Sequence, residues 1–298
     1  MESAYLLRAD GSVWTWGRNN LGQLGLGDKE TRTQPTQLTA LSNVSAIYAG
    51  YTTAFAITAD GKLHGWGEKF IGDGSSASHS APVEVPGVSD IRQLAVSWNA
   101  AFALTGSGEV YGWGYYAKQD GKTKWELSTK PKLISGLPNC VDVAVGQYTY
   151  YALTADGLVY AWGSGKNGAL GNGGTKDSAK PVKVKGLENV VDVTATSNGA
   201  FALLADGTVW GWGANLPGYA KAKSTPVQIS GLTGIARISA TYSALYSFTA
   251  DGTVYQQTNP APDLFGATTI VGADATAEKD ACLKQTCQTT RFALRAPA

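Results

Sequence analysis

"FALLADGTVWGWG", residues 201–213, is the stretch of sequence that decides the fold. Two runs of mostly apolar residues flank Asp206-Gly207, and the second run ends in Trp212-Gly213. An Asp-Gly pair between such runs is the strongest short-range signal for a β-hairpin, because both residues tolerate the positive φ angles of a type I′ turn. The stretch therefore predicts two antiparallel strands joined by a type I′ turn.

The same pattern returns along the whole chain. Its other copies are "YLLRADGSVWTWG" (5–17), "FAITADGKLHGWG" (55–67), "FALTGSGEVYGWG" (102–114), "YALTADGLVYAWG" (151–163) and "YSFTADGTVYQQT" (246–258). The last copy has lost the Trp-Gly pair, and successive turn glycines lie 45 to 50 residues apart. A period of this length predicts a repeat architecture.

Two further strands complete each unit. After Trp-Gly comes a loop and then a proline, which we expect to open a short edge strand where no backbone donor is needed. The prolines are Pro35, Pro82, Pro131, Pro181 and Pro226. A strand of β-branched and small residues follows, for example "GLENVVDVTAT" (186–196), and small side chains suit the crowded innermost strand of a radial array. Four strands per unit, repeated in a ring, predict an all-β fold: a β-propeller of four-stranded blades.

The composition limits the classes of partner. The chain of 298 residues has 37 glycines and nine tryptophans, but only 16% of its residues are charged. A formal net charge of +1 gives no general field for attracting nucleic acid or an anionic membrane surface, so we expect neither partner. No apolar run is long enough to cross a membrane, and the N-terminus lacks the basic and apolar regions of a signal peptide.

The order of strand, Asp-Gly turn, Trp-Gly, Gly-rich loop and proline strand resembles the regulator of chromosome condensation repeat family. "NNLGQLGLGD" (19–28) and "KNGALGNGG" (166–174) are that family's loop in near-consensus form. The resemblance covers nearly the whole sequence and implies a single β-propeller domain over residues 1–298. The repeats fall at about 11–60, 61–107, 108–156, 157–206, 207–251 and 252–298.

The number of blades is open between six and seven. The family usually has seven blades, whereas this chain has six repeat units. The C-terminal stretch "TTIVGAD...TTRFALRA" (268–296) supplies one more inner-strand pair, which we expect to join the N-terminal hairpin. We therefore favour six blades in a ring closed by N- and C-terminal strands, with seven blades, one of them incomplete, as the alternative.

The residues most often used in catalysis are scarce. The tryptophans of the Trp-Gly pairs, together with Trp14 and Trp210, recur at repeat positions and are expected to pack between blades. The family's plant ultraviolet-B photoreceptor surrounds clustered tryptophans with arginines, but the arginines of this chain are scattered. His64 and His79 have no partner that the sequence can place for nucleophilic or metal chemistry. We expect no enzyme activity, no cofactor and no metal.

The cysteines bear on the cellular compartment in which the protein resides. Cys140 is expected to be a small buried filler on an inner strand. Cys282 and Cys287 flank four residues in "ACLKQTC", and they are either a disulfide at a hairpin tip or two free thiols. A disulfide would imply an oxidising compartment, and we favour an extracellular or periplasmic location over a cytoplasmic one.

The candidate binding residues lie in the connection between the innermost strand and the next strand. The fourth position of this connection is commonly histidine in the family, and here it is Thr53, Ala100, Thr149, Gly199 and Ala244. The second and third positions carry aromatic and short polar residues, which are typical of binding surfaces. We expect these residues to converge at one mouth of the central channel of the propeller: Tyr51, Trp98, Gln147, Tyr148, Ser197, Asn198 and Tyr242. Trp125 is a second contact candidate. The alternative is that these rings only plug the channel.

Three functions remain open from the sequence. The loop set resembles that of the family's secreted bacterial β-lactamase inhibitory protein, which implies a protein-binding propeller, an inhibitor or an adhesion module of bacterial type. We expect the protein to be a monomer. The family name implies the alternative of a guanine nucleotide exchange factor for a small GTPase. Exposed aromatic rings also stack on sugars, so a carbohydrate-binding module is the third candidate.

Overall fold

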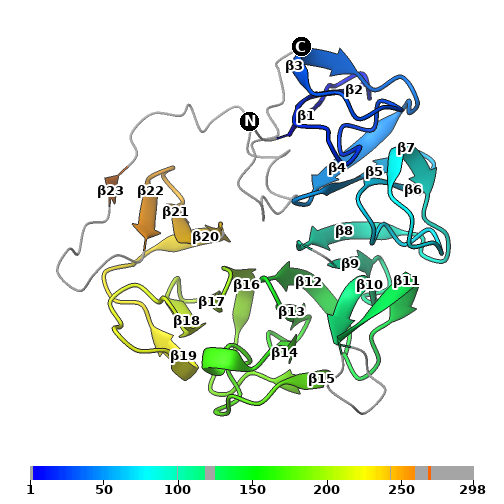
Figure 1. Ribbon diagram of the computed structural model, residues 1–298. Helices are drawn as coiled ribbons and strands as arrows, with labels where there is room; N and C mark the ends of the chain where they lie inside the picture. Colours follow the sequence, from blue (N-terminus) through cyan, green and yellow to red (C-terminus); the bar gives the residue numbers. More distant parts are fainter. Residues whose placement is uncertain (1–2, 99, 118–124, 242, 259–267, 270–298) are drawn as a thin grey trace. The chain divides into compact units, whose positions relative to one another are not determined.

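The protein is built almost entirely of antiparallel β-strands (Figure 1). The computed structural model describes residues 3–98, 100–117, 125–241, 243–258 and 268–269, except for the side chains of residues 117, 125 and 126. Within these residues the non-strand element is a single 3₁₀ turn, η1 (Lys166–Gly168). The predicted all-β fold is confirmed.

The strands of the described chain form six sheets. Three sheets belong to a first compact unit: β1 (Ala4–Leu7), β2 (Val13–Gly17) and β3 (Arg32–Gln37); β4 (Val44–Ala49), β5 (Thr53–Thr58), β6 (Leu63–Gly67) and β7 (His79–Glu84); β8 (Ile91–Val96), β9 (Ala100–Thr105), β10 (Val110–Ala117) and β11 (Trp125–Leu133). Three belong to a second unit: β12 (Cys140–Val145), β13 (Thr149–Thr154), β14 (Val159–Gly163) and β15 (Ser178–Lys183); β16 (Val190–Ala195), β17 (Gly199–Leu204), β18 (Val209–Gly213) and β19 (Lys223–Gln228); β20 (Ile235–Ala240), β21 (Ala244–Thr249), β22 (Val254–Thr258) and β23 (Thr268–Thr269).

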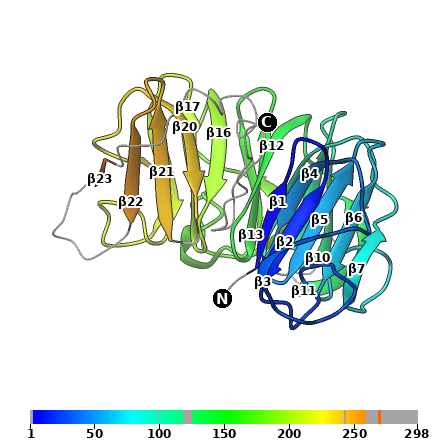
Figure 2. The same ribbon diagram turned by 90° about the horizontal axis from the view of Figure 1, so that it is seen from above.

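Five of these sheets have four strands, each paired with its neighbour in the chain, as predicted for propeller blades (Figure 2). The sheet β1–β2–β3 has three, and nothing in the described residues takes the place that β4 has beside β5. Thr268 and Thr269, at the start of the predicted closing stretch, pair instead with Gln256 and Tyr255 at the outer edge of β22. Residues 270–298 lie outside the described chain, so closure by the C-terminal stretch stays a prediction.

The predicted turn type was wrong, although the hairpins themselves are confirmed. In the turn of residues 58–62, the Gly61 N–H donates to the Thr58 carbonyl at 2.8 Å and the Thr58 N–H donates to the Lys62 carbonyl at 3.0 Å. Gly61 has a φ of 80°, but Asp60 is not left-handed. The connection is therefore a type I turn closed by a left-handed glycine, the usual form of a slightly longer hairpin loop.

The turn aspartates act as hydrogen-bond acceptors. Asp206 Oδ1 accepts from the Thr208 hydroxyl at 2.7 Å and from the Thr208 N–H at 2.9 Å. These bonds hold the pKa of the Asp206 carboxyl below its ordinary value of 3.8. Hydrogen bonds of the same kind lower the pKa of Asp10, Asp60 and Asp251.

The pH dependence of stability follows from the sign of these shifts. A carboxyl with a lowered pKa in the folded state stabilises the fold above its unfolded pKa, and this contribution is lost as pH falls through the folded value. We therefore expect the urea midpoint to decrease between about pH 4 and pH 2. Asp206→Asn should make that decrease shallower. If the urea midpoint of this variant falls with pH as steeply as that of the wild type, the stabilising role of the Asp206 carboxylate is contradicted.

The prolines lie inside the outer strands rather than at their starts, which corrects the expected position. Pro181 is the fourth residue of β15, and the pairing of β14 with β15 shifts register between Ala161, opposite Val182, and Gly163, opposite Ser178. At a register shift on an edge strand, the proline stands where no backbone N–H is needed for pairing between the strands. The sequence could not show this, because the irregularity is a property of the pair of strands.

The core of each unit is filled by the repeated aromatic residues. Trp66, Trp113, Trp162 and Trp212 are fully buried, as predicted for packing residues. In the second unit, the Trp212 indole N–H donates to the Ala169 carbonyl at 3.0 Å, and the Tyr151 hydroxyl donates to the same carbonyl at 2.8 Å. The Tyr151 and Trp212 rings meet edge to face with centroids 5.8 Å apart. The Ala169 carbonyl therefore connects two sheets, because it accepts a hydrogen bond from one buried aromatic ring of each sheet.

One carboxylate joins the inner strands β16 and β20. Asp192 Oδ2 accepts the Ile238 N–H at 3.1 Å. Burial raises the pKa of Asp192, against the opposing effects of this hydrogen bond and of the nearby Arg237 charge. The carboxylate is therefore a structural link between neighbouring sheets of the second unit.

Candidate functional site

Two exposed aromatic residues of the first unit stack on each other. Tyr51 lies between β4 and β5, and Trp98 lies between β8 and β9. Their ring centroids are 4.7 Å apart with an interplanar angle of 34°. Tyr51 is 44% exposed and Trp98 is 49% exposed, although large apolar side chains usually bury most of their surface. These two side chains are therefore in contact, while the convergence of the whole predicted set at one mouth of the channel stays a prediction.

Tight turns hold both rings in place. The Gly50 N–H donates to the Thr53 carbonyl at 2.7 Å, and the Ser97 N–H donates to the Ala100 carbonyl at 2.8 Å, so each connection is a two-residue turn. A Cβ on Gly50 would lie 2.8 Å from Val96 Cγ1 and 3.3 Å from the Ser97 carbonyl oxygen. Glycine at this position therefore allows the two turns to touch, which brings their side chains together.

A third exposed ring lies at the same end of these sheets. Gly114, near the end of β10, pairs with Ala100, which follows the Trp98 turn. Tyr115 comes directly after Gly114 and is 38% exposed. Tyr115 is not among the site residues predicted from the sequence. Its signal was a large aromatic at the position after Trp-Gly, where the other copies have Arg18, Glu68, Ser164 and Ala214.

The second unit has a more polar version of the same turns. Tyr148 is 44% exposed, whereas Gln147 and Ser197 are half-buried. The exposed Asn198 amide donates to the Ser197 hydroxyl at 3.0 Å. A Cβ on Gly146 would lie 2.7 Å from the Thr196 carbonyl oxygen, so these two turns also touch. The gathering of this set with Tyr51 and Trp98 stays a prediction.

The remaining site candidates are only partly covered by the structure. Tyr242, Cys282 and Cys287 lie outside the described residues, as does the side chain of Trp125, whose backbone begins β11. Cys140 is buried, as predicted, and burial raises the pKa of its thiol to about 11. A thiol with such a pKa is mostly protonated at neutral pH and is a poor nucleophile.

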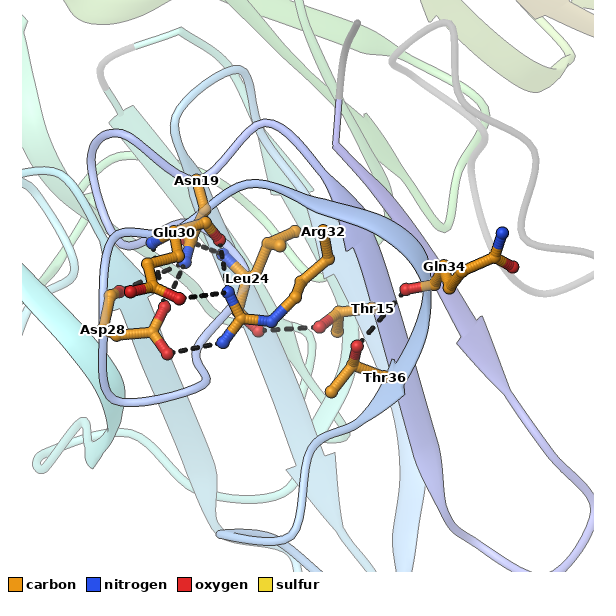
Figure 3. A network of polar contacts seen from close by, with 8 residues as sticks. All are labelled: Thr15, Asn19, Leu24, Asp28, Glu30, Arg32, Gln34 and Thr36. Atoms are coloured by element: carbon orange, nitrogen blue, oxygen red, sulfur yellow. Dashed lines mark hydrogen bonds and ion pairs between the residues drawn. The ribbon is translucent and has the colours of Figure 1, made fainter.

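The consensus loop of the first sheet is held by a polar network (Figure 3). The buried Asn19 amide donates to the backbone and side-chain oxygens of Asp28, both at 3.1 Å, while its Oδ1 accepts the Leu24 N–H at 2.9 Å. Arg32 Nη2 lies 2.5 Å from Asp28 Oδ2. The Glu30 N–H and the Arg32 guanidinium lower the pKa of Asp28. These groups bond to one another, so the network stabilises the loop.

The structure brings one serine, one histidine and one aspartate together, which the sequence analysis did not foresee. His79 Nε2 lies 3.1 Å from Asp73 Oδ2 and 3.4 Å from Ser75 Oγ. The Ser75 hydroxyl also donates directly to Asp73 Oδ2 at 3.0 Å. A nucleophile relay needs the imidazole between serine and carboxylate, one on each ring nitrogen. Here Ser75 and Asp73 both contact Nε2 of His79, so the cluster stabilises the loop that carries it.

The chain matches a repeat that known proteins carry. The Regulator of chromosome condensation (RCC1) repeat matches residues 10–57 and 156–203, and a second form of the same repeat matches residues 140–169. The chain contains RCC1 repeats. Within the described residues, no group of three or more His, Cys, Asp and Glu side chains is arranged to hold a metal ion, and no helix is long and apolar enough to cross a membrane.

Curated relatives match this chain over single short stretches. The Ultraviolet-B receptor UVR8 of Arabidopsis thaliana is 48% identical over 59 residues, which are 19% of this chain and 13% of the receptor. Protein RCC2 of Mus musculus is 36% identical over 69 residues, 22% of this chain and 13% of the relative. The matched part is thus a small fraction of each relative's length.

Two solved structures share the fold with this chain. Yeast RCC1 (Prp20), solved bound to Kap60, superposes with a TM-score of 0.69 at 22% identity, over 83% of this chain and 64% of that one. Human WBSCR16 gives a TM-score of 0.71 at 20% identity, over 83% of this chain and 71% of that one. At this identity the likeness supports the predicted β-propeller fold alone.

Proposed function

We propose that this RCC1-repeat protein is a non-catalytic binding propeller, which takes a protein partner on the sheet end that carries Tyr51 and Trp98. The stacked, half-exposed aromatic pair is the observation that carries the proposal. Aromatic side chains bury large areas with few rotatable bonds, and they dominate the energetic centres of protein interfaces. The low charge of the chain and the tight turns that fix both rings agree with a preformed surface.

The partner assay starts with the full chain as bait. A protein captured from the host's extracts is identified, purified and titrated against the chain by calorimetry. We expect Trp98→Ala and Tyr51→Ala each to weaken its binding by about 30-fold, the factor that corresponds to a loss of ~2 kcal/mol at an interface hot spot. Both residues are half-exposed turn residues, so the melting temperature should change little.

A matched control tests whether the loss is local to this site. Leu133 is a similarly exposed apolar residue, 49% accessible, at the end of the outer strand β11. Leu133→Ser should leave the affinity unchanged. Binding that survives both aromatic substitutions would refute the proposed site, and selective binding of sugars by the wild-type chain on a glycan array would instead favour the carbohydrate-binding alternative.

A nucleotide exchange factor is the second candidate, because of what similar proteins are called. One solved relative is the Saccharomyces cerevisiae protein Prp20p, whose described binding partners are Gsp1p and histones, and a mouse relative is the X-linked retinitis pigmentosa GTPase regulator. Release of a fluorescent guanine nucleotide from the host's small GTPases would measure this activity directly. If the chain accelerates nucleotide release and Trp98→Ala does not reduce that acceleration, nucleotide exchange is favoured over protein binding at the aromatic pair.

A further inference from the structure

Two sheets carry the same glycine loop between their third and outer strands. In the sheet β1–β3 this loop joins β2 to β3, and in the sheet β12–β15 it joins β14 to β15. Gly27 and Gly173 each have a φ of 90°, and their N–H groups donate to the carbonyls of Ser80 and Ser224, both at 2.8 Å. Two further pairs of left-handed glycines match: Gly22 with Gly168, and Gly25 with Gly171. The two loops therefore share one backbone path.

The two loops differ in charge. In the β2–β3 loop, Asp28 and Glu30 form ion pairs with Arg32. Residues 18–39 carry three basic and two acidic side chains, whereas residues 164–185 carry five basic side chains and one acidic side chain. Counted from the matched glycines, the lysines of the second copy replace acidic or neutral residues: Lys166 replaces Asn20, Lys176 replaces Glu30, Lys180 replaces Gln34, Lys183 replaces Gln37 and Lys185 replaces Thr39.

The fold does not require these lysines. The β2–β3 loop follows the same path with nearly balanced charges. Lysine on an outer strand can also prevent pairing with other chains. The outer strands β3 and β7 contain no lysine, so this protection is not a general feature of the sheets. An excess of lysine that neither the loop path nor the sheet edge requires points to a partner.

The packing of the β14–β15 loop gathers lysines that are distant in the sequence. A Cβ on Gly165 would lie 2.1 Å from the Lys176 carbonyl oxygen. A Cβ on Gly168 would lie 2.9 Å from the carbonyl oxygen of Lys223, which begins β19 of the next sheet. The segment 165–168, which carries Lys166, therefore contacts the backbone at both Lys176 and Lys223.

Two more lysines border the same loop. Lys185 Nζ lies 3.4 Å from the place that a Cβ on Gly173 would take. Lys221 is two residues before Lys223, whose Nζ lies 4.9 Å from the centroid of the Tyr219 ring. Five lysines of the second unit thus form what we call the lysine cluster: Lys166, Lys176, Lys185, Lys221 and Lys223.

The charges of the lysine cluster are accessible. Lys223 is half-buried, and the other four lysines are exposed. Within the residues that the structure describes, no ion pair joins any of the five to a carboxylate. The neighbouring Asp177 accepts the Gly165 N–H at 2.9 Å through its Oδ1. The cluster is therefore a local positive surface on a chain whose net charge is only +1.

We propose that the lysine cluster binds a segment of a partner protein that is rich in aspartate and glutamate. Carboxylates complement the unpaired ammonium groups, and the long lysine stems let each charge follow a flexible segment. A nucleic acid fits less well, because the cluster contains no arginine for bidentate phosphate contacts and the chain as a whole has almost no net charge. This surface belongs to the second unit and does not depend on the Tyr51–Trp98 pair.

The test titrates a fluorescent peptide of alternating glutamate and serine with the full chain at low salt, followed by polarisation. We expect binding that weakens as salt is added. Lys166→Gln combined with Lys176→Gln should weaken it by about tenfold, since each exposed ion pair contributes roughly threefold. The matched control, Lys29→Gln combined with Lys62→Gln, removes the same charge from the first unit and should leave the affinity unchanged.

The melting temperature of the first double variant should match that of the wild type, because the β2–β3 loop folds without these lysines. If that variant does not fold, Lys221→Gln alone should weaken binding by about threefold. A wild-type chain that does not bind the peptide, binding that salt does not weaken, or an equal loss in both double variants overturns the proposal. Tighter binding of a single-stranded DNA with the same charge as the peptide overturns the choice of a protein segment.

Discussion

Gly67→Ala should destabilise the first unit by about 3 to 5 kcal/mol, the range of severe single substitutions. Gly67 follows Trp66, pairs with Thr53 and has a φ of 103°. An added Cβ would lie 2.2 Å from the Thr52 carbonyl oxygen and 2.9 Å from Thr53 Cα. Both neighbours are backbone atoms, so a side-chain rotation cannot relieve the clash. The free energy of unfolding, measured by urea titration, tests this value.

Gly61→Ala is the control for backbone conformation alone. Gly61 has a φ of 80°, close to that of Gly67, but no atom lies within 4 Å of a Cβ built on it. We expect a loss of about 1 to 2 kcal/mol, the cost of a left-handed residue with a Cβ. Similar losses at the two glycines would show that close backbone approach contributes nothing at the Trp-Gly position.

The second large effect is expected for Trp212→Ala. Trp212 is fully buried, contacts Tyr151 edge to face and donates to the Ala169 carbonyl. Removing a buried tryptophan side chain leaves a cavity and costs about 3 to 5 kcal/mol. Chemical denaturation followed by far-ultraviolet circular dichroism measures the loss, and a change below 1 kcal/mol would contradict the assigned packing.

Phenylalanine substitutions separate the hydrogen bond from the packing. Trp212→Phe removes an indole N–H that has an acceptor, whereas Trp113→Phe removes one that has none. The two tryptophans are otherwise equally buried. We expect Trp212→Phe to cost about 1 kcal/mol more than Trp113→Phe, the net value of one buried hydrogen bond. The opposite order would contradict the assigned hydrogen bond of Trp212.

The repeat made most of the fold predictable, since hairpins, strand order and buried tryptophans are all encoded locally and several times over. Two details were wrong for a physical reason. The turn type depends on the hydrogen bonds that join Thr58 to Gly61 and Lys62 on either side of Asp60, and the proline position depends on a register shift between two strands. Both are properties of paired segments, which a pattern of single residues does not specify.

The site was predictable to a smaller extent. The turn positions of Tyr51 and Trp98 follow from the repeat, but their contact depends on Gly50, whose missing Cβ lets two turns meet. Tyr115 was missed because it stands at a position that the repeat treats as a loop.

The turns beneath these side chains share one construction. The N–H before the two central residues donates to the carbonyl after them at 2.7 to 2.9 Å in all five inner connections, from Gly50 to Thr241. Since this hydrogen bond joins main-chain atoms of the two residues that flank the turn, the two central residues can change in evolution while the hydrogen bond is kept. A lineage can therefore acquire a new ligand by exchanging a few codons, one sheet at a time.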